Sequence, residues 1–136
     1  MDCIFCRIVA GEVPSFKVYE DQETVAFMDI NPLTAGHLLV VPKLHCKGLF
    51  DADEATLTAA IAVARRVALA QKEALGLDSL NLVQSNGRWA AQSVDHLHFH
   101  LIPRREGDHA GMDWPLVPGE PEAIRAIAAR IAGAVA

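Results

Sequence analysis

The sequence has no long hydrophobic run, few aromatic residues and no excess of basic charge. No stretch approaches the roughly 18 apolar residues of a membrane-spanning helix, and the N-terminus lacks the basic and apolar regions of a signal peptide. Lys and Arg number 12 against 17 Asp and Glu, which gives a net charge of −5 and disfavours a general nucleic-acid or anionic-membrane binder. We therefore expect a soluble, cytoplasmic protein with neither a nucleic-acid nor a membrane partner.

Cysteine is also scarce, with Cys3, Cys6 and Cys46 only. An odd number of cysteines in a cytoplasmic chain disfavours a disulfide framework. The C-x-x-C spacing of the first two suits half of a metal site or a redox pair. A redox pair normally follows a strand and starts a helix inside a thioredoxin-like unit, whereas this pair lies at the extreme N-terminus. The metal half-site is therefore the favoured interpretation.

Apolar residues, by contrast, make up 51% of the 136 residues. A chain of this size buries a core without disulfide or metal support, and its composition excludes a disordered chain. The sequence predicts a single domain over residues 1–136. The acidic balance still allows a small phosphorylated ligand, because a few local donors are enough to hold one.

The hydrophobic pattern predicts two helices and five strands. A long helix is expected from Asp51, as its N-cap with Glu54 as reciprocal partner, to Gly76, and a short C-terminal helix starts at Pro121. The strands are expected at residues 16–21, 24–30, 37–42, 79–84 and 97–102, the first two forming a hairpin. Residues 105–120 have no regular pattern. Because strands follow one another without strict alternation with helices, we expect an α+β fold with a mostly antiparallel sheet.

Three of the six histidines lie at alternate positions in DHLHFHLI, at His96, His98 and His100. Alternate residues of a strand share one face and lie about 6.5–7 Å apart, so we expect these imidazoles to project together. Leu97, Phe99 and Leu101 would pack into the core on the other side, and Pro103 would end the strand. An ordinary polar strand face explains the row less well, because it concentrates half of the chain's histidines in five residues.

Two chemistries suit such a row. It could bind a catalytic metal, since His-x-His is a common ligand spacing, or one imidazole could be a nucleophile with the others binding the substrate. Gln92 and Ser93 precede the row in a loop that contains Asn86 and Gly87. Amide, hydroxyl and backbone N–H donors beside imidazoles suit an oxyanion, phosphate in particular, and therefore favour the nucleophile.

At this point the sequence resembles the histidine triad (HIT) family, in its Hint-like branch. QSVDHLHFHLI is similar to the family signature, three histidines separated by apolar residues with Gln-Ser shortly before them. The segment from DCIFC to PKLH matches at the same intervals in its C-x-x-C, Phe-x-Asp-Ile, Gly-His and Pro-Lys-x-His. The resemblance covers residues 2–104 and implies a HIT-like fold. The tail, residues 105–136, adds little to it.

The resemblance implies an enzyme that splits a nucleoside monophosphate from a leaving group. His98 would attack the α-phosphorus and form a transient nucleotidyl-histidine, which water then hydrolyses. Ser93, Gln92 and His100 would donate to the phosphate oxygens and the leaving group, with His37 orienting the row. Asp29 would bind the ribose hydroxyls, although a plain Asp at a strand end is an alternative. Phe27 and Ile30 would line the base pocket, unless they are ordinary core residues.

The resemblance also implies a structural zinc ion held by Cys3, Cys6, His45 and His96. Two thiolates and two imidazoles make a closed tetrahedral site that leaves no open position to activate water. The alternative is that Cys3 and Cys6 are ordinary buried thiols. The family further implies a homodimer with the long helix near the interface, which the apolar stripe from Leu57 to Ala68 allows without requiring it.

Three positions depart from the family pattern and leave the leaving group undecided. Ser85 stands where relatives often carry Asn, with Asn86 next to it as a substitute. Ala91 replaces a usual Gly and should keep a negative φ. Asp95 stands where relatives often carry an aromatic residue, and strand alternation should point it away from the triad. The favoured substrates are AMP-like phosphoramidates or related adenylates. The alternatives are a dinucleoside polyphosphate (Ap4A-type) hydrolase, a purine-nucleotide-binding protein of low turnover, and a zinc hydrolase with the triad as ligands.

Overall fold

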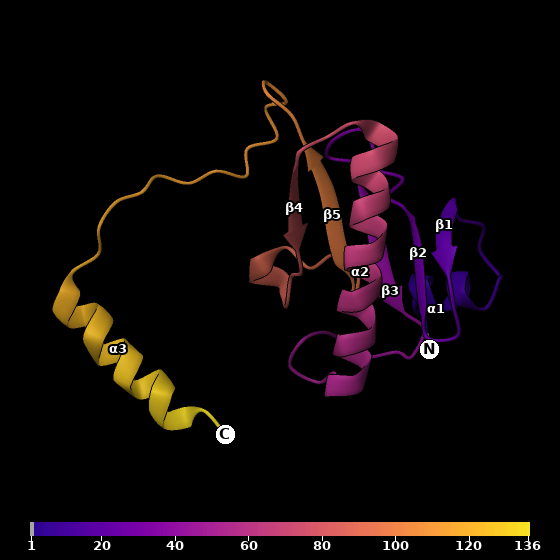
Figure 1. Cartoon of the computed structure of the whole chain (residues 1–136). Helices are drawn as coiled ribbons and strands as arrows, with labels where there is room; N and C mark the ends of the chain where they lie inside the picture. The colour runs from indigo at the N-terminus through magenta and orange to yellow at the C-terminus, as the bar shows by residue number, and fades with distance from the viewer. Residues whose placement is uncertain (1) are drawn as a thin grey trace.

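A computed structural model describes residues 2–136. Over these residues the chain forms three α-helices, one 3-10 helix and a five-stranded sheet. Figure 1 shows α2 lying across the sheet. The helices are α1 (Ile4–Val9), α2 (Glu54–Leu75), η1 (Arg88–Ala90) and α3 (Pro121–Ala134). The strands are β1 (Lys17–Glu20), β2 (Thr24–Met28), β3 (Leu38–Pro42), β4 (Ser79–Val83) and β5 (Phe99–Arg104).

The sheet has the order β1-β2-β3-β5-β4, and every neighbouring pair is antiparallel. Asp21 closes the expected hairpin between β1 and β2, because its Oδ1 accepts hydrogen bonds from the N–H groups of Glu23 and Thr24. The expected α+β fold, with an antiparallel five-stranded sheet, one long helix and a C-terminal helix, is confirmed. Helix α1 was not predicted from the sequence.

Both faces of the sheet are covered in its middle. One core lies between α2 and the sheet and includes Leu38, Val40, Phe99 and Leu101. The other lies on the opposite face, beside α1, and includes Leu39 and Val41 together with Phe5 and Phe27. Adjacent residues of β3 thus enter different cores, as the alternation of a strand requires. Leu101 and Phe99 pack on the α2 face, which turns the intervening His100 towards α1.

The N-cap of α2 is Asp53 rather than the expected Asp51. Asp53 Oδ1 accepts a hydrogen bond from the N–H of Thr56 at 2.7 Å, and Glu54 is the first helical residue instead of a reciprocal cap. Asp51 instead accepts from the N–H groups of Lys47 and Gly48 and closes the preceding turn. The expected C-terminal stop is correct, since Gly76 caps α2 with a left-handed φ of 62°.

Strand β5 begins and ends two residues later than expected. It starts at Phe99 and continues through Pro103, which is paired with Leu80 of β4. The carbonyl of Pro103 accepts a hydrogen bond from Thr34 Oγ1. Because the N and C=O of one strand residue point to the same side, the Pro103 nitrogen faces away from β4. On that side the pairing with β3 ends at Leu101, so the missing N–H costs no ladder bond.

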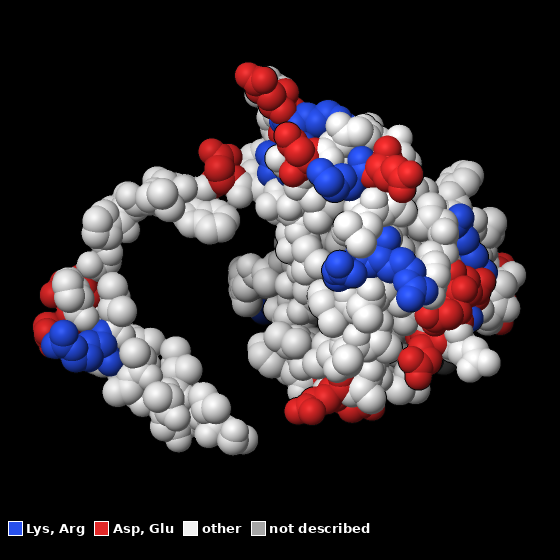
Figure 2. Space-filling view, in the orientation of Figure 1, with Lys and Arg blue, Asp and Glu red and all other residues white. Residues whose placement is uncertain are grey.

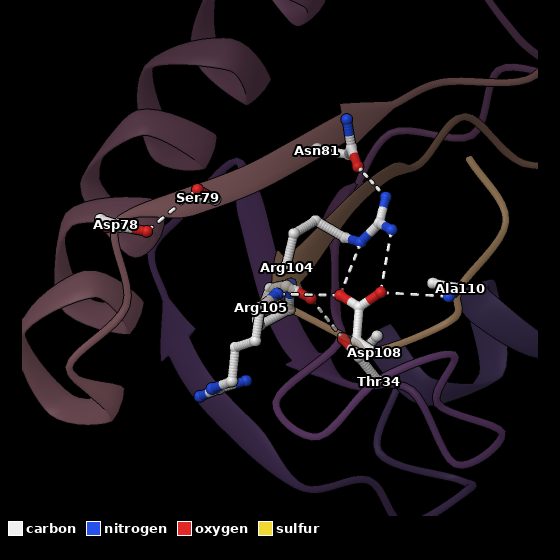
Figure 3. Close-up of polar contacts among 9 residues, drawn as sticks. Thr34, Asp78, Ser79, Asn81, Arg104, Arg105, Asp108 and Ala110 are labelled. Carbon is white, nitrogen blue, oxygen red and sulfur yellow. Dashed lines mark hydrogen bonds and ion pairs between the residues drawn. The ribbon is translucent and has the colours of Figure 1, made fainter. Parts of the chain in front are cut away.

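The tail leaves the body at a fixed point beyond β5 (Figure 3). Arg104 donates two hydrogen bonds to Asp108, of 2.9 and 3.0 Å, and a third to Asn81 of β4. These donors and the N–H groups of Arg105 and Ala110 hold the pKa of the Asp108 carboxyl far below its usual range. Beyond this clamp the chain extends to α3, which lies apart from the rest of the molecule in Figure 1. Within residues 2–136, no helix is long and apolar enough to cross a membrane.

Candidate functional site

A pocket of about 280 Å³ opens on the α1 face of the sheet. Residues from several parts of the chain meet there, because the end of β2 and the starts of β3 and β5 are adjacent in the sheet. The residues that were predicted for the site and line this pocket are Phe27, Asp29, Ile30, Ser93, His98 and His100. The structure therefore brings the predicted nucleophile together with the predicted base and ribose residues.

His98 is almost fully buried, with 3% of its surface exposed, and its orientation fixes its proton. Its Nδ1 lies 2.7 Å from the backbone oxygen of His96. A carbonyl only accepts, so Nδ1 must carry the hydrogen, and the neutral ring keeps its lone pair on Nε2. The ring of Phe5 packs against it edge-on, with centroids 5.1 Å apart. His98 thus offers the pocket a fixed, unprotonated nitrogen.

His37 and His100 are joined in a hydrogen-bonded series in which the position of each hydrogen is defined. The N–H of Leu33 donates to His37 Nδ1 at 2.9 Å, so neutral His37 carries its hydrogen on Nε2. That nitrogen lies 2.9 Å from Nδ1 of His100 and donates to it. His100 must then carry its own hydrogen on Nε2. Asp29 Oδ2 is 3.5 Å from His37 Nε2, beside this chain.

The histidines of the pocket are held neutral. Burial lowers the pKa of His37 and that of His98, and it outweighs the opposing influence of Asp29 on both. The pKa of His100 is lowered to about 4, by burial first and then by the neighbouring His98 and His37. A neutral imidazole keeps one lone pair, so His98 has an unprotonated Nε2 near pH 7.

A second cluster lies beside the pocket and contains Cys3, Cys6, His45 and His96. Nδ1 of His96 is 3.3 Å from Cys3 Sγ and 3.1 Å from His45 Nδ1, and Cys6 Sγ is 3.3 Å from His45 Nδ1. A tetrahedral zinc site with two sulfur and two nitrogen ligands places its ligand atoms about 3.3–3.8 Å apart. The spacing and the donor types therefore fit zinc.

His96 has the proton arrangement that a metal ligand requires. Its Nε2 lies 2.8 Å from the carbonyl oxygen of Pro42, so the hydrogen is on Nε2 and the lone pair of Nδ1 faces the cysteines. His96 is fully buried, and its backbone oxygen is the acceptor that orients His98. The residue thus belongs to the Cys/His cluster through its side chain and to the pocket through its backbone.

Three predicted substrate residues lie outside the pocket lining. The Gln92 amide donates to the backbone oxygens of Lys47 and Val94 and accepts from the N–H of Gly87. The Asn86 side chain accepts from the N–H of Leu49 and pairs with Gln84. Ser85 lies between Gln84 and Asn86 in the sequence. In this structure Gln92 and Asn86 hold the loop together, and the substrate contacts expected of these three residues stay a prediction.

Two further observations correct or extend the sequence analysis. Ala91 adopts a left-handed φ of 63°, so the expectation that this residue keeps a negative φ is wrong. The turn is held by two backbone hydrogen bonds: the N–H of Ala91 donates to the backbone oxygen of Arg88, and the N–H of Gln92 donates to that of Gly87. Sequence reasoning also missed Phe5, which contacts His98 and lines the pocket. Its helical spacing to Ile8 was the available signal.

A buried histidine with a fixed proton, beside a Cys/His cluster at one end of an antiparallel sheet, is an arrangement of the histidine triad type. The chain matches the HIT domain over residues 10–107, and it belongs to that family. It is 46% identical over 115 residues to "Adenosine 5'-monophosphoramidase HNT1" of Saccharomyces cerevisiae, covering 83% of this chain and 70% of the yeast protein.

Two solved structures resemble the whole chain. The crystal structure of a HIT family protein from Bacillus subtilis superposes with a TM-score of 0.93 at 36% identity, covering 100% of this chain and 99% of that one. A Zn-bound histidine triad family protein from Mycobacterium smegmatis gives a TM-score of 0.78 at 37% identity, with 99% of both chains covered.

Proposed function

We propose that this protein is a nucleotide hydrolase that releases AMP or a similar nucleoside monophosphate from phosphoramidates and related adenylates. The observation that carries the proposal is the fixed proton of His98, which leaves Nε2 free as a nucleophile inside the pocket. A relative whose name describes an adenosine 5'-monophosphoramidase supports the substrate class.

The reaction proceeds in two displacements at phosphorus. His98 Nε2 attacks the α-phosphorus, a P–N bond to the imidazole forms, and the bond to the leaving amine or phosphate breaks. The leaving group takes a proton from the Ser93 hydroxyl as it departs, while the Nε2–H of His100 hydrogen-bonds to the phosphate oxygens without transferring its proton. Water then attacks the nucleotidyl-histidine and gives up a proton that restores the Ser93 hydroxyl, while the monophosphate is released and His98 returns to its neutral form.

The order of protons in the pocket suits this chemistry. Because His37 donates to Nδ1 of His100, His100 directs an N–H rather than a lone pair away from His37. That hydrogen stabilises the charge that grows on the phosphate oxygens during the attack. We assign His37 to positioning and His100 to the phosphate oxygens. Gln92 remains a proposed donor once a substrate is bound.

The remaining pocket residues divide between ribose and base. Asp29 Oδ1 accepts from the N–H of Asn31, and its Oδ2 faces His37 and the pocket. A carboxylate there can accept hydrogen bonds from ribose hydroxyls. Phe27 and Ile30 form apolar walls, the first buried and the second exposed at the rim. Flat apolar walls favour a purine base over a phosphate-only ligand.

Cys3, Cys6, His45 and His96 would hold a structural zinc ion. When bound, zinc cross-links these four side chains and supplies no open position for catalysis. The cluster joins α1 to the segment before β5, because Cys3 and Cys6 come from the first and His96 from the second. We also propose a homodimer in the cytoplasm, with α2 near the interface.

The test is a comparison of AMP release by the wild type, His98→Asn and His109→Asn. The substrates are an adenosine phosphoramidate and diadenosine tetraphosphate. The amide introduced by His98→Asn can still donate to the His96 carbonyl but lacks the nucleophilic lone pair, so the rate should fall at least about a thousandfold. His109 is exposed in the tail and serves as the matched control.

Each outcome has a definite meaning. A mass increase of one AMP on wild-type protein, absent from His98→Asn, supports the covalent step. Faster release from the phosphoramidate than from the tetraphosphate supports the favoured substrate class, and the reverse order supports the Ap4A-type alternative. Equal AMP release by wild type and His98→Asn on both substrates would refute the hydrolase. Loss of activity on chelation, at a temperature where the fold persists, would support the zinc hydrolase.

A further inference from the structure

The C-terminal arm, residues 105–136, carries an apolar helix face without any cover from its own chain. Every residue of α3 is exposed. Ile124, Ile127 and Ile131 are exposed by 58, 48 and 61%, respectively, and they recur at helical spacing on one side. An isolated helix of 14 residues is marginally stable in water, so most helices of this length depend on packing of such a face. The stripe therefore requires a partner.

Contacts at the start of the arm direct it away from the body. The clamp between Arg104 and Asp108 fixes its first residues against β4. Figure 2 shows the charged side chains of α3 on its outer side, so that the side turned towards the body is uncharged. Open space separates this uncharged side from the body in the same view. The geometry leaves room for another molecule between them.

The superposition on the B. subtilis structure indicates that another protein also carries its C-terminal arm away from its body. Residues 105–136 are almost a quarter of the 136 residues. A structure that placed its arm elsewhere would lose that share of the superposition, yet the B. subtilis crystal structure matches over 100% of this chain with a TM-score of 0.93. An experimentally determined chain thus also carries its arm away from its own body.

The body has a groove that fits the arm and that its own chain leaves open. It has a volume of about 330 Å³ and lies between α2 and strands β1 and β2. Its lining is mostly apolar and includes Val18, Met28, Ala70, Ala74 and Leu75. Val18 and Leu75 are exposed by 50 and 42%. Such a surface favours an aliphatic helix face over a charged ligand.

The groove also contains a polar atom without a partner. Gln71 is 5% exposed and lines the groove. Its Nε2 donates to the backbone oxygens of Gly36 and Leu101, but its Oε1 has no hydrogen-bond partner among the described residues. A buried acceptor without a donor is costly, so the natural occupant should bring an N–H group. Helix α3 carries Arg125 and Arg130 on either side of its isoleucine stripe.

We propose that α3 of one copy packs its isoleucine stripe into the groove between α2 and β1–β2 of a second copy. This packing rests on the proposed homodimer with α2 near the interface, and the groove borders that helix. Ile61 and Leu69 of α2 and Leu82 of β4 are all more than 40% exposed and are available for contact between the two bodies. The body of each copy then lies between the body and the arm of the other copy, so that the two copies exchange their arms.

The experiment places a photo-cross-linking amino acid, p-benzoyl-phenylalanine, at position 127 of the full chain. After irradiation, a denaturing gel separates cross-links within one chain from those between two chains. We expect a dimer-sized band in which position 127 is joined to peptides containing residues 17–20 or 66–75. Ala70→Glu in the groove, or Ile131→Glu on the arm, should reduce that band about tenfold or more, because a buried charge replaces apolar contact.

Ala129→Glu is the matched control, since Ala129 lies on the opposite side of α3 from the stripe, and it should leave the band unchanged. AMP release by each variant checks that the body is folded. A product of monomer size only, or no product above the non-irradiated sample, would overturn the exchange of arms. A dimer band mapped to other residues would overturn the assignment of the groove.

Discussion

Nε2 of His37 lies 2.9 Å from Nδ1 of His100, and the two rings share a single hydrogen along this contact. Protonating His100 would place two N–H groups against each other. His37, His98 and Asp29 are the titratable groups around His100, and only Asp29 favours its charged form. The balance keeps His100 neutral in the folded protein, and a dependence of stability on pH follows.

We predict that the free energy of unfolding decreases as the pH falls from about 6.5 to about 4. The pKa of His100 is about 4 in the folded chain, whereas an unfolded histidine has a pKa of about 6.5. Between these values the unfolded state binds more protons, so acidification favours it. The contribution of His100 is complete above pH 6.5 and is lost towards pH 4.

Urea unfolding at pH 7.5, 6 and 5 measures this dependence. The variant His100→Asn should show a shallower decrease than the wild type, because one lowered pKa has been removed. His109→Asn keeps the pocket intact and should retain the wild-type slope. A slope in His100→Asn as steep as in the wild type would contradict the assignment.

We predict that substitutions in the Cys/His cluster, and not elsewhere, remove bound zinc. Protein produced with zinc should contain one zinc ion per chain, because the four candidate ligand atoms lie within 4.8 Å of one another. Cys3→Ser and Cys6→Ser should lose most of this zinc and unfold at a lower temperature. Cys46 is buried outside the cluster, so Cys46→Ser should retain the zinc. Elemental analysis with thermal unfolding decides the matter, and equal zinc contents in all three variants would exclude the proposed ligands.

The strained turn at Ala91 predicts a stabilising substitution. A left-handed conformation costs a non-glycine residue about 1–2 kcal/mol. Replacing that residue by glycine removes this cost, but the greater conformational freedom of glycine in the unfolded chain offsets about 0.4–1 kcal/mol of the gain. Ala91→Gly, at φ 63°, should therefore raise the free energy of unfolding by about 0.5–1 kcal/mol. Ala90→Gly, in η1, lacks this strain and should lower it. If urea unfolding ranks the two variants in the opposite order, the backbone at Ala91 is not strained.

We predict that the effect of Asp29 on kcat/KM depends on the ribose hydroxyls of the substrate. Asp29→Asn should lower kcat/KM for an adenosine phosphoramidate about 10- to 100-fold, because a charged acceptor is lost. The same variant should act on the 2′,3′-dideoxy substrate almost as the wild type does, since that substrate has no hydroxyls to bind. Steady-state kinetics with both substrates separate this role from general damage to the pocket, which would slow the two equally.

Much of the site could be predicted because it depends on strand alternation. His98 and His100 flank Phe99, and the apolar residue enters the α2 core while His100 enters the pocket. His96 is different: it precedes β5, and its side chain faces Cys3 and Cys6 instead. Strand alternation thus predicted that the three histidines lie close together, but not that His96 belongs to the Cys/His cluster while His98 and His100 line the pocket.

Other features depend on contacts distant in sequence and were not predictable. The continuation of β5 through Pro103 requires that β3 ends its pairing at Leu101, which no local pattern reveals. The same holds for Gln92, whose amide is committed to Lys47 and Val94. The capping of α2 by Asp53 rather than Asp51 was a choice between two suitable residues, and a preceding turn decided it.

Helix α1 lies against both the Cys/His cluster and His98. Phe5 lies edge-on against both His96 and His98, at 5.9 and 5.1 Å between ring centroids. Cys3 caps the same helix and belongs to the Cys/His cluster. Because one short helix contacts both the Cys/His cluster and the ring of His98, any change that moves α1 would displace the cluster and the wall of the pocket together.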